Sequence, residues 1–258
     1  MTHPDLVPPG QAADICHITL DDLVWALRQG WNDYRRAPAF GMFFSAVYVA
    51  GGIVLWLALG ISGRVWWTVP VTVGFPILGP FAAVGLYEVS RRLERGEGLA
   101  WGPVLGVVLS QKDRQIPSMS AVIVVFFLFW MFLAHMIFAL FLGLQAMTEV
   151  STSYAVFLTP HGLAMLGFGT LVGAVFAGVL FATTVVSLPM LLDREVDFVT
   201  AMITSVQVVL GNPLVMLIWA AVIAICLFAA MLPVFLGLFV ALPVLGHASW
   251  HLYRRAVF

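Results

Sequence analysis

The sequence predicts an all-α integral membrane protein in which six transmembrane helices form three parallel repeats. The first observation is composition: 62% of the residues are hydrophobic, 10% are charged and the mean hydropathy is +1.02. A soluble domain has an apolar share nearer ~45 to 50%. The second observation is a series of long apolar stretches, and the third is the concentration of basic residues at one end of them. Together these patterns are typical of a multi-pass membrane protein.

Six apolar stretches have about the length that a helix needs to cross a bilayer. A hydrocarbon core of ~30 Å takes ~20 helical residues. The predicted spans are 40–60, 66–87, 118–146, 164–191, 214–231 and 234–252. Only Pro233 separates the last two, and we expect a tight outer turn there because one continuous helix would overshoot the bilayer. We expect residues 1–18 to form an N-terminal tail and residues 19–258 to form the membrane domain.

The distribution of basic residues predicts the orientation of these spans. All but one of the lysines and arginines fall on one side, and only Arg64 falls on the other. The one-sided set is Arg28, Arg35, Arg36, Arg91, Arg92, Arg95, Lys112, Arg114, Arg194, Arg254 and Arg255. The positive-inside rule places this side, and with it both termini, in the cytoplasm. Aromatic rings are expected at the inner surface, among them Trp31, Trp101, Trp250 and Tyr253.

Two sets of matching residues predict internal repeats of residues 19–97, 98–195 and 196–258. Asp22-Leu-Val-Trp-Ala-Leu before Pro38 matches Asp197-Phe-Val-Thr-Ala-Met before Pro213 at a constant offset of 175. Further on, Pro70, Gly74, Pro80, Arg91 and Arg92 match Pro233, Gly237, Pro243, Arg254 and Arg255 at a constant offset of 163. The middle copy, around Pro117, matches poorly in its second half. An even number of spans in each unit makes the repeats parallel.

Each repeat is predicted to open with a short cytoplasmic helix that ends before its proline. In the first, Leu20, Leu23, Val24, Leu27, Trp31 and Tyr34 form an apolar stripe. The spacing of Thr19 and Asp22 is that of a capping box, which predicts the start of the helix. A helix with one apolar and one charged face suits the membrane interface. Proline then marks the turn into the span, because it disfavours helical geometry in the residue before it.

His247 and His251 are candidate metal ligands because their i, i+4 spacing points both imidazoles along one helical face. The alternative is structural: His247 would bond a neighbouring helix while His251 reaches toward the interface. His135 is a possible intramembrane polar site, since ionisable residues within spans are often functional. Its alternative is a neutral hydrogen bond between helices. His135 and His247 lie at different depths and are not expected to share a metal.

Two further patterns predict contacts. Gly169, Gly173 and Ala177 form a stripe of small residues on the fourth span, which suits either packing within the chain or contact with an oligomer. Glu88 and Glu94 flank Arg91, Arg92 and Arg95, which suggests a solvated helix end or a surface for anionic lipid.

These observations predict a non-catalytic accessory or regulatory protein that binds a membrane partner, lipid or a second copy of itself. No P-loop, nucleophile elbow or His-Glu-x-x-His motif is present, so we predict no catalytic residue and no cofactor. A net charge of −1 gives no basis for nucleic-acid binding. Two alternatives remain open: a small carrier or channel lined by the kinked second and sixth spans, and a metal- or haem-binding membrane protein.

Two segments resemble a family of predicted bacterial integral membrane proteins with a domain of unknown function. They are DREVDFVTAMITSVQVVLGNPLVMLIWAA at 193–221 and LPVLGHASWHLYRR at 242–255. The resemblance covers most of the chain, is strongest in the final third and implies a multi-pass protein of the bacterial inner membrane. Some members are labelled cytochrome c oxidase subunit I. This sequence does not support the label, because only His135 and His247 lie clearly within predicted spans.

Overall fold

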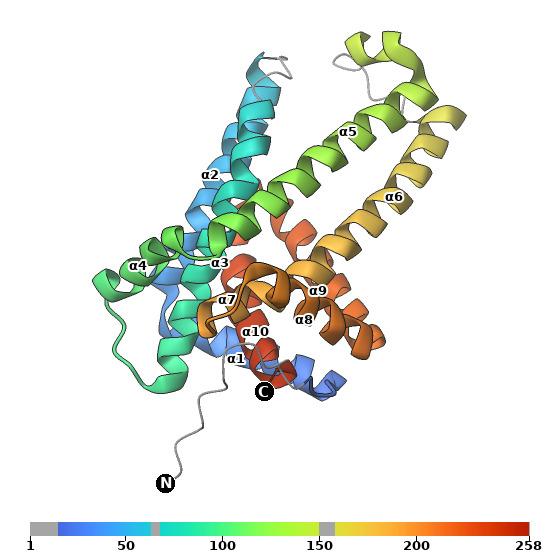
Figure 1. Ribbon diagram of the computed structural model, residues 1–258. Coiled ribbons are helices and arrows are strands. Elements are labelled where there is room, and N and C mark those ends of the chain that lie inside the picture. The colour runs from blue at the N-terminus through green and yellow to red at the C-terminus, as the bar shows by residue number, and fades with distance from the viewer. Residues whose placement is uncertain (1–14, 63–67, 150–157, 258) are drawn as a thin grey trace.

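The computed structural model describes residues 15–62, 68–149 and 158–257, and these residues are almost entirely helical (Figure 1). The helices are α1 (Leu20–Arg36), α2 (Pro38–Ser62), α3 (Thr68–Arg95), α4 (Trp101–Ser110), α5 (Ile116–Glu149), α6 (Pro160–Thr184), α7 (Ser187–Asp193), α8 (Phe198–Gly211), α9 (Pro213–Met231) and α10 (Leu238–Ala256), with a 3₁₀ turn η2 (Gln111–Asp113). Within the described residues there is no β-strand, only an isolated bridge between Ile15 and Val257. The all-α prediction is confirmed.

Three of the described helical segments are long and apolar enough to cross a membrane. They are Ile116–Gly143, Pro160–Asp193 and Pro213–Met231. The bent pair Leu20–Arg36 and Pro38–Val54 meets the same test when taken together, which gives up to four spans. The other two predicted spans fall on α3 and α10, and a total of six stays a prediction.

The predicted start and end of the first short helix are confirmed. The Thr19 hydroxyl accepts from the Asp22 backbone N–H, and the Asp22 carboxylate accepts from the Thr19 N–H, which completes the capping box. The helix ends at Ala37, whose φ of −135° and ψ of 53° leave the helical region just before Pro38. Asn212, before Pro213, has nearly the same angles, −132° and 51°. The chain bends by 101° between α1 and α2.

The short helices each pack on a long helix from elsewhere in the chain. α1 lies along α10, α4 along α3, and α8 along α6. The longer helices partly follow the same order, since α2 packs on α10 and α5 on α3. By the same pattern, α9, which follows α8, would pack on α6. These two helices are described in full, and they have no contact of comparable extent. The three-repeat arrangement therefore stays a prediction.

The last residues of the predicted N-terminal tail are held against the helices. The Cys16 N–H donates to the Ala256 carbonyl at 3.0 Å, and the Ile18 N–H donates to Asn212 Oδ1 at 2.8 Å. Asn212 also donates to the Cys16 carbonyl. The start of α1, the α8–α9 junction and the end of α10 are thereby joined.

Candidate functional site

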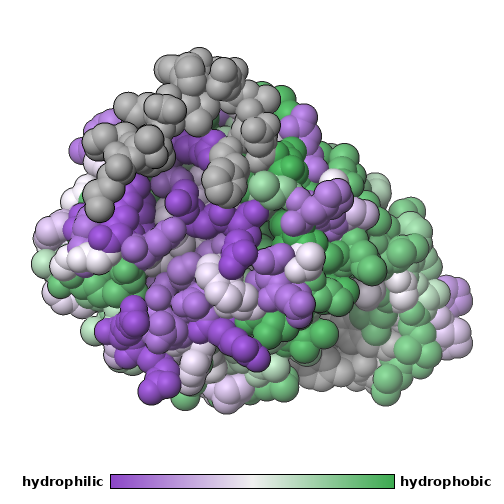
Figure 2. Space-filling model, turned by 90° about the horizontal axis from the view of Figure 1, so that it is seen from below, coloured by the Kyte–Doolittle hydropathy of each residue, from purple (hydrophilic) through white to green (hydrophobic). Residues whose placement is uncertain are grey.

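Hydrophilic side chains gather at the end of the molecule that holds α1 and the end of α10 (Figure 2). Arg91, Arg92, Arg95, Arg114, Arg254 and Arg255 each lie within ion-pair distance of a carboxylate. Several of these pairs join different helices, such as Arg254 on α10 with Asp193 on α7 at 3.2 Å. This polar end is therefore a connected network rather than a set of isolated surface charges.

A buried hydrogen bond within this network joins α1 to α10. His251 Nε2 lies 2.7 Å from Asp33 Oδ2, and both residues are buried. Trp25 meets the His251 ring edge-on, at 5.7 Å between ring centroids. The expectation that His251 reaches to the interface is therefore wrong, because a carboxylate on the opposing helix binds it inside the protein. Sequence reasoning gave Asp33 no role, although it continues the face that carries Ala26 and Gly30.

His247, one turn earlier on α10, contacts α3. Its Nδ1 lies 2.8 Å from the Ser90 hydroxyl, as the structural alternative predicted, while its buried Nε2 has no partner in the described part of the chain. No group of three or more His, Cys, Asp or Glu side chains among the described residues is arranged to hold a metal ion. Metal binding by His247 and His251 stays a prediction, and the observed partners are Ser90 and Asp33.

The charged end of α3 is only partly the predicted solvated helix end, since Glu94 and Arg95 are exposed but Glu88 is not. Glu88 is completely buried and accepts from both Arg91 Nε and Arg92 Nε at 2.7 Å. Glu94 accepts from Trp250 Nε1 at 3.0 Å. Trp250 and Tyr253 are both buried. The prediction that their rings lie in an aromatic belt at the inner membrane surface is therefore wrong. These aromatic side chains pack between helices because their polar atoms find carboxylate partners there.

The α5–α6 hairpin packs on α3 and α8 and projects beyond them from the helical body (Figure 1). Of the residues in the most apolar 18-residue window, 6% are buried in α5 and 17% in α6, and the others are half-buried or exposed. The three small residues of the predicted stripe, Gly169, Gly173 and Ala177, have different surroundings. A Cβ on Gly173 would lie 2.9 Å from Trp130 of α5, so Gly173 serves packing within the hairpin. Gly169 borders open space and Ala177 is exposed.

An apolar groove of about 320 Å³ runs between the two hairpin helices, and Gly169 lies on its wall. Trp130, Ile137 and Met165 also line it. A Cβ on Gly169 would meet only Ile137, at 3.9 Å, so a larger residue there would project into the groove.

His135 lies on the exposed surface of α5. Its Nδ1 is 2.7 Å from the Met131 carbonyl of the same helix, so Nδ1 carries the proton and donates. The predicted bond to another helix does not occur among the described residues. No bond to Nε2 is seen among the described residues, and the ring lies in an apolar surface that includes Phe132 and Met136.

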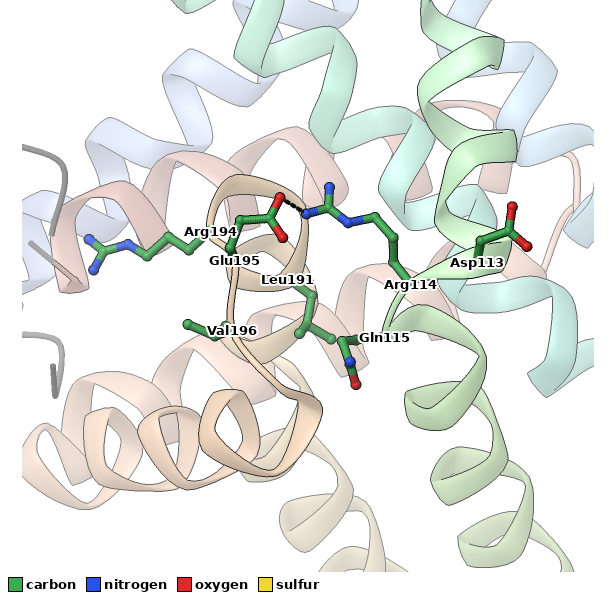
Figure 3. A pocket seen from close by; sticks show the side chains of 7 residues that line it. All are labelled: Asp113, Arg114, Gln115, Leu191, Arg194, Glu195 and Val196. Atoms are coloured by element: carbon green, nitrogen blue, oxygen red, sulfur yellow. Dashed lines mark hydrogen bonds and ion pairs between the residues drawn. The ribbon is translucent and has the colours of Figure 1, made fainter. Parts of the chain in front are cut away.

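A second hollow, of about 360 Å³, lies at the polar end between the start of α5 and the α7–α8 linker (Figure 3). Arg114 and Glu195 pair across it, and Asp113 lies at its edge. The Arg194 side chain points away from Arg114. The pair between Arg114 and Glu195 ties α5 to the linker.

The helical architecture, the apolar spans and the polar end define an integral membrane protein. Residues 68–193, close to half of the chain, match the family described as predicted integral membrane protein DUF2189. The match lies in the middle of the chain, whereas the resemblance was based on 193–221 and 242–255. No curated protein and no solved structure matches the chain significantly. The family description agrees with a membrane-embedded protein of unknown function.

Proposed function

We propose that the protein is a non-catalytic component of the bacterial inner membrane that binds another membrane protein through the α5–α6 hairpin. In this proposal the six apolar helices α2, α3, α5, α6, α9 and α10 cross the membrane as three parallel repeats. Both termini and the polar end face the cytoplasm. The basic residues gathered at that end support the orientation.

The low burial of α5 is the observation that carries the proposal. Helices in a membrane associate through close packing and interhelical hydrogen bonds. Only 6% of the residues in the apolar window of α5 are buried, and Val125, Phe132 and Leu140 are each more than half exposed, so one side of this helix is free for lipid or for another helix. The order of contacts α1 on α10, α4 on α3 and α8 on α6 supports the repeats, and the hairpin would stand out from the bundle as an arm.

Two features favour a partner helix over lipid alone at the hairpin. The groove beside Gly169 has room for a side chain of another helix. His135 leaves its Nε2 without a bond in the described part of the same hairpin, and a polar atom in an apolar surface favours a partner that can hydrogen-bond to it. α9 is as exposed as α6, but its sequence carries no histidine or charged residue.

Photocrosslinking in cells tests this proposal. A benzophenone side chain would replace the exposed residues Leu140 or Leu171 of the hairpin, and Leu217 or Phe228 of α9 as controls. We expect one discrete protein adduct from the hairpin positions and none from α9. Equal adducts from both helices, or lipid adducts alone from the hairpin, would contradict partner binding there.

A groove-filling variant tests the same surface by loss of binding. Gly169→Leu is expected to lower recovery of the crosslinked partner several-fold, because its side chain enters the groove. Gly178→Leu is the matched control, since a Cβ at Gly178 meets nothing within 4 Å. If the two variants lose the partner equally, the groove has no specific role.

The two remaining alternatives stay predictions. A carrier requires a polar path between α3 and α10, and the described contacts there include His247 with Ser90 and the close approach of Gly246 to Leu86. A metal or haem site requires ligands in addition to His247 and His251.

A further inference from the structure

Four arginines at the polar end have no carboxylate partner among the described residues: the half-buried Arg194 of the α7–α8 linker and three that lie together on α1. Arg28, Arg35 and Arg36 are exposed on α1, and none of them forms an ion pair within the described residues. By contrast, Arg91, Arg92, Arg95, Arg114, Arg254 and Arg255 all lie near carboxylates. The positive charge on the outer surface of α1 is therefore not neutralised by any carboxylate in the described part of the chain.

The free arginines lie beside an apolar strip on the outer surface of α1. Leu23, Ala26 and Gly30 belong to the buried face of α1, which packs on α10. Leu20, Val24 and Trp31, by contrast, are 51%, 47% and 47% exposed. Arg28 follows Val24 by four residues, and Arg35 follows Trp31 by four, so each arginine neighbours an exposed apolar side chain on the helix surface.

The bend at Pro38 determines how this face meets the membrane. α1 and α2 are bent by 101°, so if α2 crosses the bilayer, α1 lies close to the membrane plane. A helix in that position buries its apolar strip at the level of the headgroups and places its arginines among the phosphates. Asp22 does not cancel this charge, since it caps α1 and lies 3.5 Å from Arg255. Asp33 is buried beside His251, so the exposed surface of α1 carries Asp21 against three arginines and is basic.

We propose that the outer face of α1 binds anionic phospholipid headgroups at the cytoplasmic surface of the membrane. Charge complementarity and the adjacent apolar strip identify the ligand: a phosphate-bearing headgroup attached to an acyl chain. The inference rests on α2 crossing the membrane, as proposed above, and is independent of the partner proposed for the hairpin. Each basic residue near an anionic membrane surface contributes on the order of a fivefold increase in lipid affinity.

Trp31 provides a reporter within the proposed site. The full-length protein would be placed in nanodiscs of phosphatidylcholine with one part in ten of phosphatidylglycerol. Bromine would be attached either to the phosphatidylglycerol chains or to an equal amount of the phosphatidylcholine, so that total composition is constant. The contribution of Trp31 to the fluorescence is obtained by difference from Trp31→Phe. We expect stronger quenching of Trp31 by the brominated phosphatidylglycerol.

Charge variants identify the source of that preference. In the double variant Arg28→Gln with Arg35→Gln, we expect the two brominated lipids to quench Trp31 equally. Lys112→Gln, which removes an exposed lysine from η2, is the control, and we expect it to keep the stronger quenching by brominated phosphatidylglycerol. These surface changes should leave the helical circular dichroism unaltered. Equal quenching by the two lipids in the unmodified protein would overturn the proposal, as would a preference that survives the double substitution.

A final arm separates a lipid headgroup from soluble phosphate. Inorganic phosphate is added at constant ionic strength, with chloride as the reference. The lipid preference is expected to persist, because the acyl chain holds the headgroup at the surface. Loss of the preference in phosphate alone would show a site for the free anion and overturn lipid as the ligand. Because these nanodiscs contain no partner protein, the result does not depend on hairpin binding.

Discussion

The helices α1 and α8 hold corresponding places in the chain and face different surroundings. Both end at a residue with φ near −130° directly before a proline, and both pack on a long helix. At the constant offset of 175 residues, however, Arg28 of α1 corresponds to Ile203 of α8, and Arg35 corresponds to Leu210. All four of these side chains are exposed. α1 therefore suits a charged surface, and α8 suits an apolar one.

The buried faces of the two helices differ in the same way. Asp33 of α1 corresponds to Val208 of α8, and both are buried. A buried valine needs no specific partner, whereas a buried carboxylate requires a donor. His251 supplies that donor from α10. The comparison shows that α1 is fixed in place by a specific polar contact, while α8 depends more on apolar packing.

The largest effect is expected from removing the partner of Asp33. His251→Leu leaves the carboxylate buried without its Nε2 donor, and breaking a buried pair in this way costs about 3 to 5 kcal/mol. Titration with SDS in mixed micelles measures the change in the free energy of unfolding. Adding Asp33→Val, which reproduces the α8 residue, should recover most of the loss. If the single variant is as stable as the parent protein, the pair does not hold α1.

The next effect concerns the close approach of α1 to α10. A Cβ on Gly30 would lie 2.5 Å from the Val244 carbonyl oxygen and 2.7 Å from the Ala248 nitrogen. Both are backbone atoms, so Gly30→Ala must separate the helices, and we expect a loss of about 2 to 3 kcal/mol.

The same titration provides the control on α8. A Cβ on Gly211 meets nothing within 4 Å, so Gly211→Ala should be neutral or gain up to ~1 kcal/mol from helix propensity. A Gly30→Ala protein that unfolds like the parent would show that the two helices are not in close contact.

Local sequence patterns predicted the helices, the α1 capping box and the turns at Pro38 and Pro213. These features depend on residues within a few positions of one another. The pairs that join different helices at the polar end do not: Asp33 and His251 are 218 residues apart, and Glu94 and Trp250 are 156 apart. Periodicity shows which side of a helix is apolar, but it does not show which helix packs there. Glu88 was therefore predicted to be solvated, although packing buries it.

The smallest effect distinguishes the two helix caps. In α1, Thr19 is the cap and Asp22 completes the box; in α8, Asp197 is the cap and Thr200 follows three residues later. Thr19→Ala should cost about 1 kcal/mol. Hydrogen bonds from Thr19, together with the charge of Arg255, hold the pKa of Asp22 below its usual value. A carboxylate with a lowered pKa stabilises the fold above its ordinary pKa of ~4, and this contribution is lost as the pH falls through the lower value.

Unfolding titrations between pH 7 and pH 3 measure that loss. Because Thr19→Ala removes the hydroxyl bond to Asp22, it should also reduce the dependence of stability on pH in the acidic range. Asp197→Asn is the corresponding change in α8, where bonds from Thr200 lower the pKa of Asp197 in the same direction. The two variants should thus each remove part of the acid sensitivity, and their effects should add because the caps share no hydrogen-bond partner. A Thr19→Ala protein with the full acid sensitivity of the parent would show that the capping box does not hold the charge of Asp22.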